Sequence, residues 1–147
     1  MDPLSITASI ITVLGAAATI AKQLDLLRKT IQTASTTLCA LSNEISDLKV
    51  VLDACDSAIA EVHSNLALGR PRIPLADVAQ VIDRIKGSLS ELEDIVLSCL
   101  SSAKGNGSSR HLAKLKWTRE KSKAQRLQSQ IREGKKDILV LLESHSA

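Results

Sequence analysis

Aromatic residues are almost missing from this sequence: Phe and Tyr are absent, and Trp117 is the only aromatic side chain. Proteins that bind single-stranded nucleic acid stack bases on several aromatic side chains, so this scarcity weighs against that class. Proline and glycine are also scarce, with three and six residues among 147. The apolar residues are mostly Leu, Ile, Val and Ala. In a chain long enough to bury a core, this composition favours an all-helical domain.

Cysteine is rare as well. The three cysteines, Cys39, Cys55 and Cys99, are widely spaced and form no C-x-x-C pair. Each falls within an apolar helical pattern. We expect all three to be small buried hydrophobic side chains in a reducing compartment, not disulfides or metal ligands.

Catalytic motifs are missing too. His63, His111 and His145 lie on different segments without metal-ligand spacing, and we expect them to be mostly exposed. The sequence holds no G-x-x-x-x-G-K-[ST] motif, and the two glycines of Gly105-Asn-Gly107 follow no strand pattern. No serine has a recognisable Ser/His/Asp setting. We therefore predict no catalytic residue, no cofactor site and no metal site, and a function other than catalysis.

What the sequence does have is a regular apolar pattern. Apolar residues recur at spacings of three and four along four segments, which predicts amphipathic helices. In chain order the four stripes are Ile6, Ile10, Val13, Ala17, Ile20, Leu24, Leu27 and Ile31; Leu38, Leu41, Ile45, Leu48, Leu52, Cys55, Ile59, Val62 and Leu66; Leu75, Val78, Ile82, Ile85, Leu89, Leu92, Val96 and Cys99; and Trp117, Ala124, Leu127, Ile131, Gly134, Ile138 and Leu141.

Local signals set the ends of these helices. Asp2 can cap the first helix, and Pro3 suits its first position. The pattern blurs over residues 32–37, which leaves open whether residues 1–36 form one helix or two. Loops are expected at 69–74, with Pro74 starting the third helix, and at 104–109; the last helix runs to about residue 144. We predict an antiparallel bundle of four to five long helices in a single domain, residues 1–147.

Two further expectations concern single positions. Gly134 on a buried stripe costs up to about 1 kcal/mol in helix propensity, which close approach of a neighbouring helix would explain. Five acidic residues of the second helix fall off its stripe and are expected on a solvated face: Glu44, Asp47, Asp53, Asp56 and Glu61.

The first helix carries no charge from Pro3 to Ala21. A secretory signal would need a positive start, but only Asp2 precedes this run. As a helix the run reaches about 28 Å, close to the hydrocarbon thickness of a bilayer. Its strongly apolar residues favour insertion by only about −2 to −4 kcal/mol, against five Ser/Thr, one Gly and one Pro. They are Leu4, Ile6, Ile10, Ile11, Val13, Leu14 and Ile20.

Burial offers another explanation for the missing charge. A helix without charge on any side suits the centre of a bundle, and in the resting state we expect this helix to be surrounded on all sides. We also hypothesise that it enters a bilayer in another state. A face of small residues, Ser5, Ser9, Thr12 and Ala16, would then suit close helix packing in lipid.

The net charge of +3 conceals an asymmetry: residues 1–109 carry 9 basic and 12 acidic side chains, and residues 110–147 carry 10 and 4. The basic cluster consists of Arg110, Lys114, Lys116, Arg119, Lys121, Lys123 and Arg126. It can be a plain solvated face, or a surface for anionic headgroups at about 1 kcal/mol per charge. Nucleic acid is a weaker alternative, since zinc-finger spacing and interleaved aromatics are missing. Trp117, among the lysines, is expected in the core or at the bundle edge, with interfacial anchoring as the alternative.

The opening MDPLSITASIITVLGAA, the two heptad-patterned helices after it and the late Leu115-Lys-Trp117 with its basic helix resemble the fungal HeLo-like N-terminal domain. This resemblance implies a bundle similar to the four-helix executioner domain of the mixed lineage kinase domain-like protein. It also implies a role in fungal immune-type receptors and death effectors, which oligomerise and damage the plasma membrane. Leu4 to Ala21 would be the membrane-active helix. A regulatory downstream domain or an amyloid-motif partner is further implied, and the chain would be one domain of a larger protein.

Together these features predict a non-enzymatic cell-death effector, cytoplasmic at rest and relocating to the plasma membrane on activation. It would self-associate and permeabilise anionic membranes through its first helix, without a cofactor and without nucleic acid. The alternative is a protein–protein signalling bundle with no direct membrane activity.

Overall fold

The computed structural model describes residues 3–31, 36–64, 73–103 and 107–146, and these form four helices: α1 (Pro3–Ile31), α2 (Thr36–Ser64), α3 (Leu75–Ser102) and α4 (Gly107–Ser146). The predicted all-helical bundle is confirmed, and residues 3–31 are one helix. Pro3 and Pro74 stand at helix starts as expected; the Val78 amide donates to the Pro74 carbonyl over 3.1 Å. The expected cap at Asp2, the break after Ile31 and residues 69–72 and 104–106 of the two expected loops lie outside the described residues. The second loop was expected to run to residue 109, but α4 already begins at Gly107.

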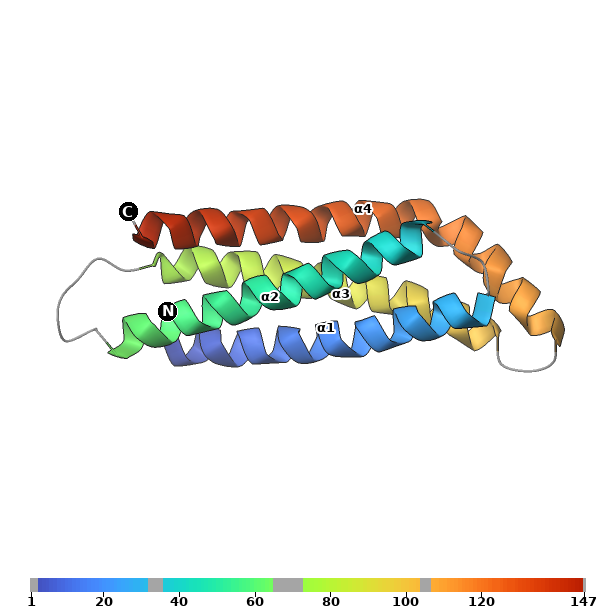
Figure 1. Ribbon diagram of the computed structural model, residues 1–147, viewed down its shortest axis with the longest axis horizontal. Coiled ribbons are helices and arrows are strands. Elements are labelled where there is room, and N and C mark those ends of the chain that lie inside the picture. Colours follow the sequence, from blue (N-terminus) through green and yellow to red (C-terminus); the bar gives the residue numbers. More distant parts are fainter. Residues whose placement is uncertain (1–2, 32–35, 65–72, 104–106, 147) are drawn as a thin grey trace.

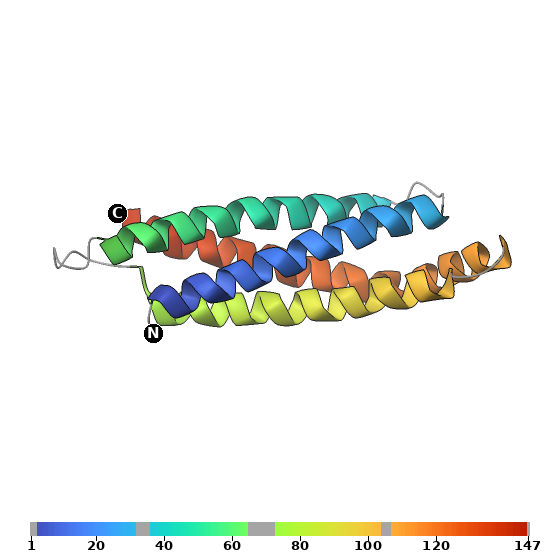
Figure 2. The same cartoon turned by 90° about the horizontal axis from the view of Figure 1, so that it is seen from below.

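The helices form an up-down-up-down bundle with four corners (Figures 1 and 2). α1 and α4 each pack against both α2 and α3, so α1 and α4 occupy opposite corners. The first turns of α4 incline towards the end of the bundle where α1 ends (Figure 1). With 40 residues, α4 is the longest helix, about 60 Å at about 1.5 Å per residue.

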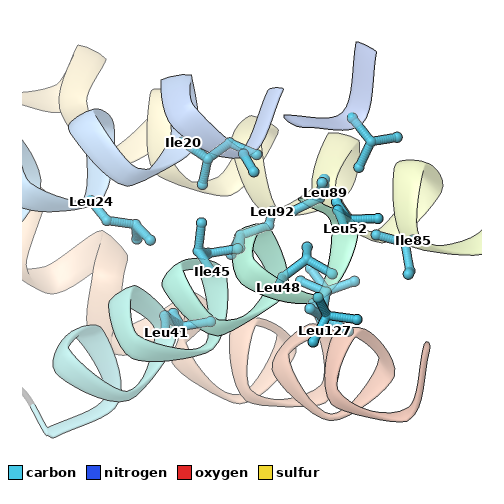
Figure 3. Close-up of a cluster of buried hydrophobic side chains, with 14 of the residues drawn as sticks. Ile20, Leu24, Leu41, Ile45, Leu48, Leu52, Ile85, Leu89, Leu92 and Leu127 are labelled. Atoms are coloured by element: carbon cyan, nitrogen blue, oxygen red, sulfur yellow. The ribbon is translucent and has the colours of Figure 1, made fainter. Parts of the chain in front are cut away.

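One core fills the space between the four helices. The predicted stripes supply most of it, and Figure 3 shows Ile20 and Leu24 of α1 meeting Ile45 of α2 and Leu92 of α3. Trp117 joins this core and is only 3% exposed, with its indole N–H buried and without a hydrogen-bond partner. The position expected for Trp117 is therefore confirmed.

Gly134 lies where α4 packs tightly against Ile85 of α3. A Cβ atom built on Gly134 would lie 2.6 Å from Cγ1 and 2.9 Å from Cδ1 of Ile85. Real Cβ atoms do not come so near another carbon, because non-bonded carbon atoms repel each other well inside their contact distance of about 3.5–4.0 Å. The expectation that this glycine permits a neighbouring helix to approach is confirmed.

Two expectations about single side chains are wrong. Glu44 is not on a solvated face: it is 5% exposed between α2 and α4, where Arg132 Nε donates to it over 3.0 Å and Lys135 Nζ over 2.7 Å. Cys39 is exposed, whereas Cys55 and Cys99 are buried as expected. Both deviations follow from the position of the residue on the helix. Glu44 lies three residues after Leu41 and four before Leu48, so it shares their inward side. Cys39 lies one residue after Leu38, so its side chain points outward.

Candidate functional site

The outward side of α1 is the clearest candidate for a functional surface. The inward side packs on α2 and α3 through Ile6, Ile10, Val13, Ala17, Ile20, Leu24, Leu27 and Ile31. The opposite side is open: Leu4 is 62% exposed and Ile11 59% exposed. The expectation that α1 is surrounded on all sides is therefore wrong. In a bundle of four helices at four corners, each helix keeps one side towards the solvent.

Of the seven residues proposed for membrane activity, the structure separates two groups. Ile6, Ile10, Val13 and Ile20 are buried in the core, whereas Leu4 and Ile11 are exposed and Leu14 is half-buried. Small residues complete the open side: Ser5, Ala8, Ser9, Thr12, Gly15 and Thr19 are exposed, and Ala16 and Ala18 are half-buried. We call this uncharged side, from Leu4 to Thr19, the α1 outer face.

Three hydroxyl groups on the α1 outer face are already hydrogen-bonded within the helix. Ser9 Oγ donates to the Ser5 carbonyl over 3.2 Å, and Thr12 Oγ1 donates to the Ala8 carbonyl over 3.0 Å. Thr19 Oγ1 donates to the Gly15 carbonyl over 3.1 Å. A hydroxyl that keeps its acceptor can be covered without the cost of an unmade hydrogen bond, about 1–3 kcal/mol. The α1 outer face is thus suited to burial by an apolar neighbour.

The length and apolar composition of α1 also make it a candidate for contact with a membrane. Among the described residues, α1 is the one helix long and apolar enough to cross a membrane, and 28% of its most apolar stretch is buried. A core helix would be mostly buried, so this low fraction shows that the bundle hides only one side of α1. Length and composition alone are weak support for a span, and the exposed side is the firmer observation.

The basic residues lie elsewhere. Arg110, Lys114, Arg119, Lys121, Lys123 and Arg126 are exposed on the first half of α4, and Lys116 is half-buried. Because α4 starts at the end of the bundle where α1 finishes, this cluster and the first half of α1, which carries the α1 outer face, lie at opposite ends of the bundle (Figures 1 and 2). The structure does not bring the two candidate surfaces together.

Reactive groups are few in the described part of the chain. No group of three His, Cys, Asp or Glu side chains there could hold a metal ion. Burial raises the pKa of the Cys55 and Cys99 thiols to about 11. Cys39 lies next to Arg28, whose pKa is raised mainly by its hydrogen bond to the Cys39 thiol and further by Asp25. His111 is exposed as expected, and the side chains of His63 and His145 lie outside the described ones.

Two features of the sites were missed in the sequence. Exposed leucines accompany the basic cluster: Leu112 is 54% and Leu115 49% exposed. Their distance of three residues, off the stripe that leads to Trp117, was a signal that they share an outward face. The Gln23 amide also reaches from α1 to Glu93 of α3 over 3.3 Å; no sequence pattern indicated that contact.

Comparison with known proteins gives a family. A family model described as "Pigment biosynthesis cluster protein PigL N-terminal" matches residues 1–146. No curated protein and no solved structure matches the chain.

Proposed function

The chain belongs to the PigL N-terminal family, a family of fungal N-terminal domains. For this member we propose the role of a non-enzymatic cell-death effector domain. In this proposal copies of the bundle associate and permeabilise the plasma membrane, to which they move from the cytoplasm. The resemblance of the opening residues to HeLo-like domains supports it.

The observation that carries the proposal is the α1 outer face. Leu4 and Ile11 lie seven residues apart on one side of a helix that carries no charge over residues 3–21, so both belong to one continuous uncharged surface. Ser9, Thr12 and Thr19 need no water as hydrogen-bond partner. This face can therefore pass from water to an apolar surrounding at low cost, which is what association in or on a membrane requires.

A second candidate function rests on the same face. A partner domain could cover it instead of lipid, and the bundle would then be a protein–protein signalling module. The two functions differ in what happens to vesicles, since a signalling module leaves their contents inside.

Dye release from vesicles of phosphatidylcholine with phosphatidylserine tests the proposal. Ile11→Glu changes an exposed residue, so the bundle should stay folded, whereas a charge at the fully buried Ile10 would unfold it. A carboxylate in the apolar region of a bilayer costs about 3 kcal/mol, and we expect dye release to fall at least tenfold. Val50→Glu on α2, where the side chain is 69% exposed, is the matched control and should leave dye release unchanged.

Two results would contradict the proposal. If Ile11→Glu and Val50→Glu reduced dye release equally, the added negative charge and not the α1 outer face would control dye release. A folded protein that releases no dye in any oligomeric fraction would favour the signalling module.

A further inference from the structure

Contacts with the neighbouring helices divide the basic cluster of α4 between two sides. Gln130 accepts a hydrogen bond from Ser88 of α3 over 3.0 Å, which places Gln130 on the α3 side of α4. Gln125 donates to Thr37 of α2 over 3.3 Å, which places Gln125 on the α2 side. Residues three, four or seven apart share a side of a helix. Lys123 and Arg119 therefore lie on the α3 side of α4 with Gln130. Lys121 and Lys114 lie on the α2 side with Gln125.

The α3 side carries the two leucines as well. Leu112 precedes Arg119 by seven residues, and Leu115 precedes it by four, so one outward strip holds Leu112, Leu115, Arg119, Lys123 and Arg126. We call it the α4 strip. All five side chains are exposed, and the strip is about 21 Å long at about 1.5 Å per residue. The α2 side holds Lys114 and Lys121 without an exposed leucine between them.

The charges of the α4 strip are available to a partner. In the described part of the chain no carboxylate forms an ion pair with Arg119, Lys123 or Arg126, whereas Arg132 and Lys135 further along α4 are paired with Glu44. Arg119, Lys123 and Arg126 are therefore free to contact an external anion.

We propose that the α4 strip docks the folded bundle on an anionic lipid surface, with Leu112 and Leu115 in the headgroup region and the three cations on the headgroups. Basic side chains beside exposed leucines are typical of helices that lie on a membrane. A nucleic-acid backbone would use the cations but not the leucines, and the only aromatic residue is buried in the core.

This docking rests on the proposed membrane function but adds a step that it does not contain. The α4 strip and the α1 outer face lie at opposite ends of the bundle, on helices that occupy opposite corners along most of its length (Figures 1 and 2). A bundle held on lipid by the α4 strip therefore keeps the α1 outer face away from that lipid. Docking precedes any action of α1 and does not need α1 to leave the core.

Vesicle flotation of the full chain tests the docking, with phosphatidylcholine vesicles that contain or lack phosphatidylserine. At about 1 kcal/mol per cation, Arg119→Gln with Arg126→Gln should weaken binding to the anionic vesicles about 30-fold. Lys114→Gln with Lys121→Gln removes the same charge from the α2 side, and we expect less than a threefold change. Leu112→Ser with Leu115→Ser should weaken binding roughly tenfold, and Leu139→Ser, at an exposed leucine outside the strip, should not.

Several outcomes would overturn the proposal. Equal loss for the two cation pairs would mean that net charge alone attracts the protein. If vesicle binding did not depend on Leu112 and Leu115, and the protein bound tightly to duplex DNA or to polyglutamate, the ligand of the α4 strip would be a polyanion and not a lipid surface. Ile11→Glu separates this proposal from the proposed function, because that variant should still float with anionic vesicles while releasing no dye.

Discussion

At the scale of the residue, Glu44 forms a buried ionic contact between α2 and α4. The Glu44 carboxylate is almost fully buried and accepts hydrogen bonds from Arg132 and Lys135. At the surface, Asp47 Oδ2 lies 3.7 Å from Nζ of the same Lys135. Removing one partner of a buried pair leaves the other charge uncompensated. We expect Glu44→Gln to lower the free energy of unfolding by about 3 kcal/mol, measured by urea denaturation.

Asp47→Asn is the control for Glu44→Gln, since it removes a carboxylate that faces the same lysine from the solvent. Exposed pairs contribute about 0–1 kcal/mol. If the two variants lost the same stability, burial of Glu44 would not matter.

Gly134 offers a test in which helix propensity and packing oppose each other. Alanine is favoured over glycine by up to about 1 kcal/mol in a helix, but at this position the added carbon meets Ile85. Overpacking costs about 1–3 kcal/mol, so Gly134→Ala should lower the thermal midpoint. Gly87→Ala, where nothing lies within 4 Å of the added carbon, should raise it. A higher midpoint for both would contradict the close approach of α3 and α4.

The cysteines differ in exposure, and thiol labelling can show it. Near neutral pH a thiol reagent should modify Cys39 alone in the folded protein and all three cysteines after unfolding. The thiol pKa of Cys55 and Cys99 is 9.0 in the unfolded chain, and burial raises it to about 11 in the folded protein. Between these values the unfolded state holds fewer protons, so the contribution of Cys55 and Cys99 to stability falls as pH rises. Labelling of three thiols at neutral pH without denaturant would show that the core opens.

At the scale of the helix, the sequence predicted the inward sides well and the outward sides poorly. A stripe such as Val78, Ile82, Ile85 and Leu89 has one physical explanation, burial against a neighbour, and all four are buried. Missing charge has two explanations. The absence of Lys, Arg, Asp and Glu from residues 3–21 suits a surrounded helix and equally suits a helix with an uncharged open side. Only the neighbours of α1 decide between the two.

The basic cluster shows the same limit in another way. Its residues and their exposure could be expected from composition, but their division between the α2 and α3 sides depends on the rotation of α4. Gln125 and Gln130 fix that rotation through contacts with α2 and α3, respectively, and those partners are 88 and 42 residues away in the chain. Periodicity within a single helix carries no information about such distant pairs.

At the scale of the whole molecule, the bundle resists the release of α1. Seven large apolar side chains of α1 are buried, and at about 1.5–3 kcal/mol each their removal costs about 10–20 kcal/mol. Insertion of α1 returns only about −2 to −4 kcal/mol and leaves α2 and α3 uncovered. A single copy should therefore stay closed, and association of several copies is needed to cover the exposed core.

A chemical lock tests whether α1 leaves the bundle. Gln23 and Glu93 meet between α1 and α3, so Gln23→Cys with Glu93→Cys, in a Cys39→Ser background, can be bridged by a short bis-maleimide. If release is required, the bridged protein should still float with anionic vesicles but release less than a tenth of the dye. The unbridged double variant is the control, and dye release that survives bridging would show that the closed bundle is active.

The hydroxyls of the α1 outer face have one more consequence. Because Ser9, Thr12 and Thr19 donate to carbonyls of the helix itself, only their oxygen lone pairs remain to accept hydrogen bonds from water. We expect such a face to stay hydrated on a single copy and to be covered at low cost if copies come together. The proportion of hydroxyl to methyl groups along α1 would then set how readily copies associate.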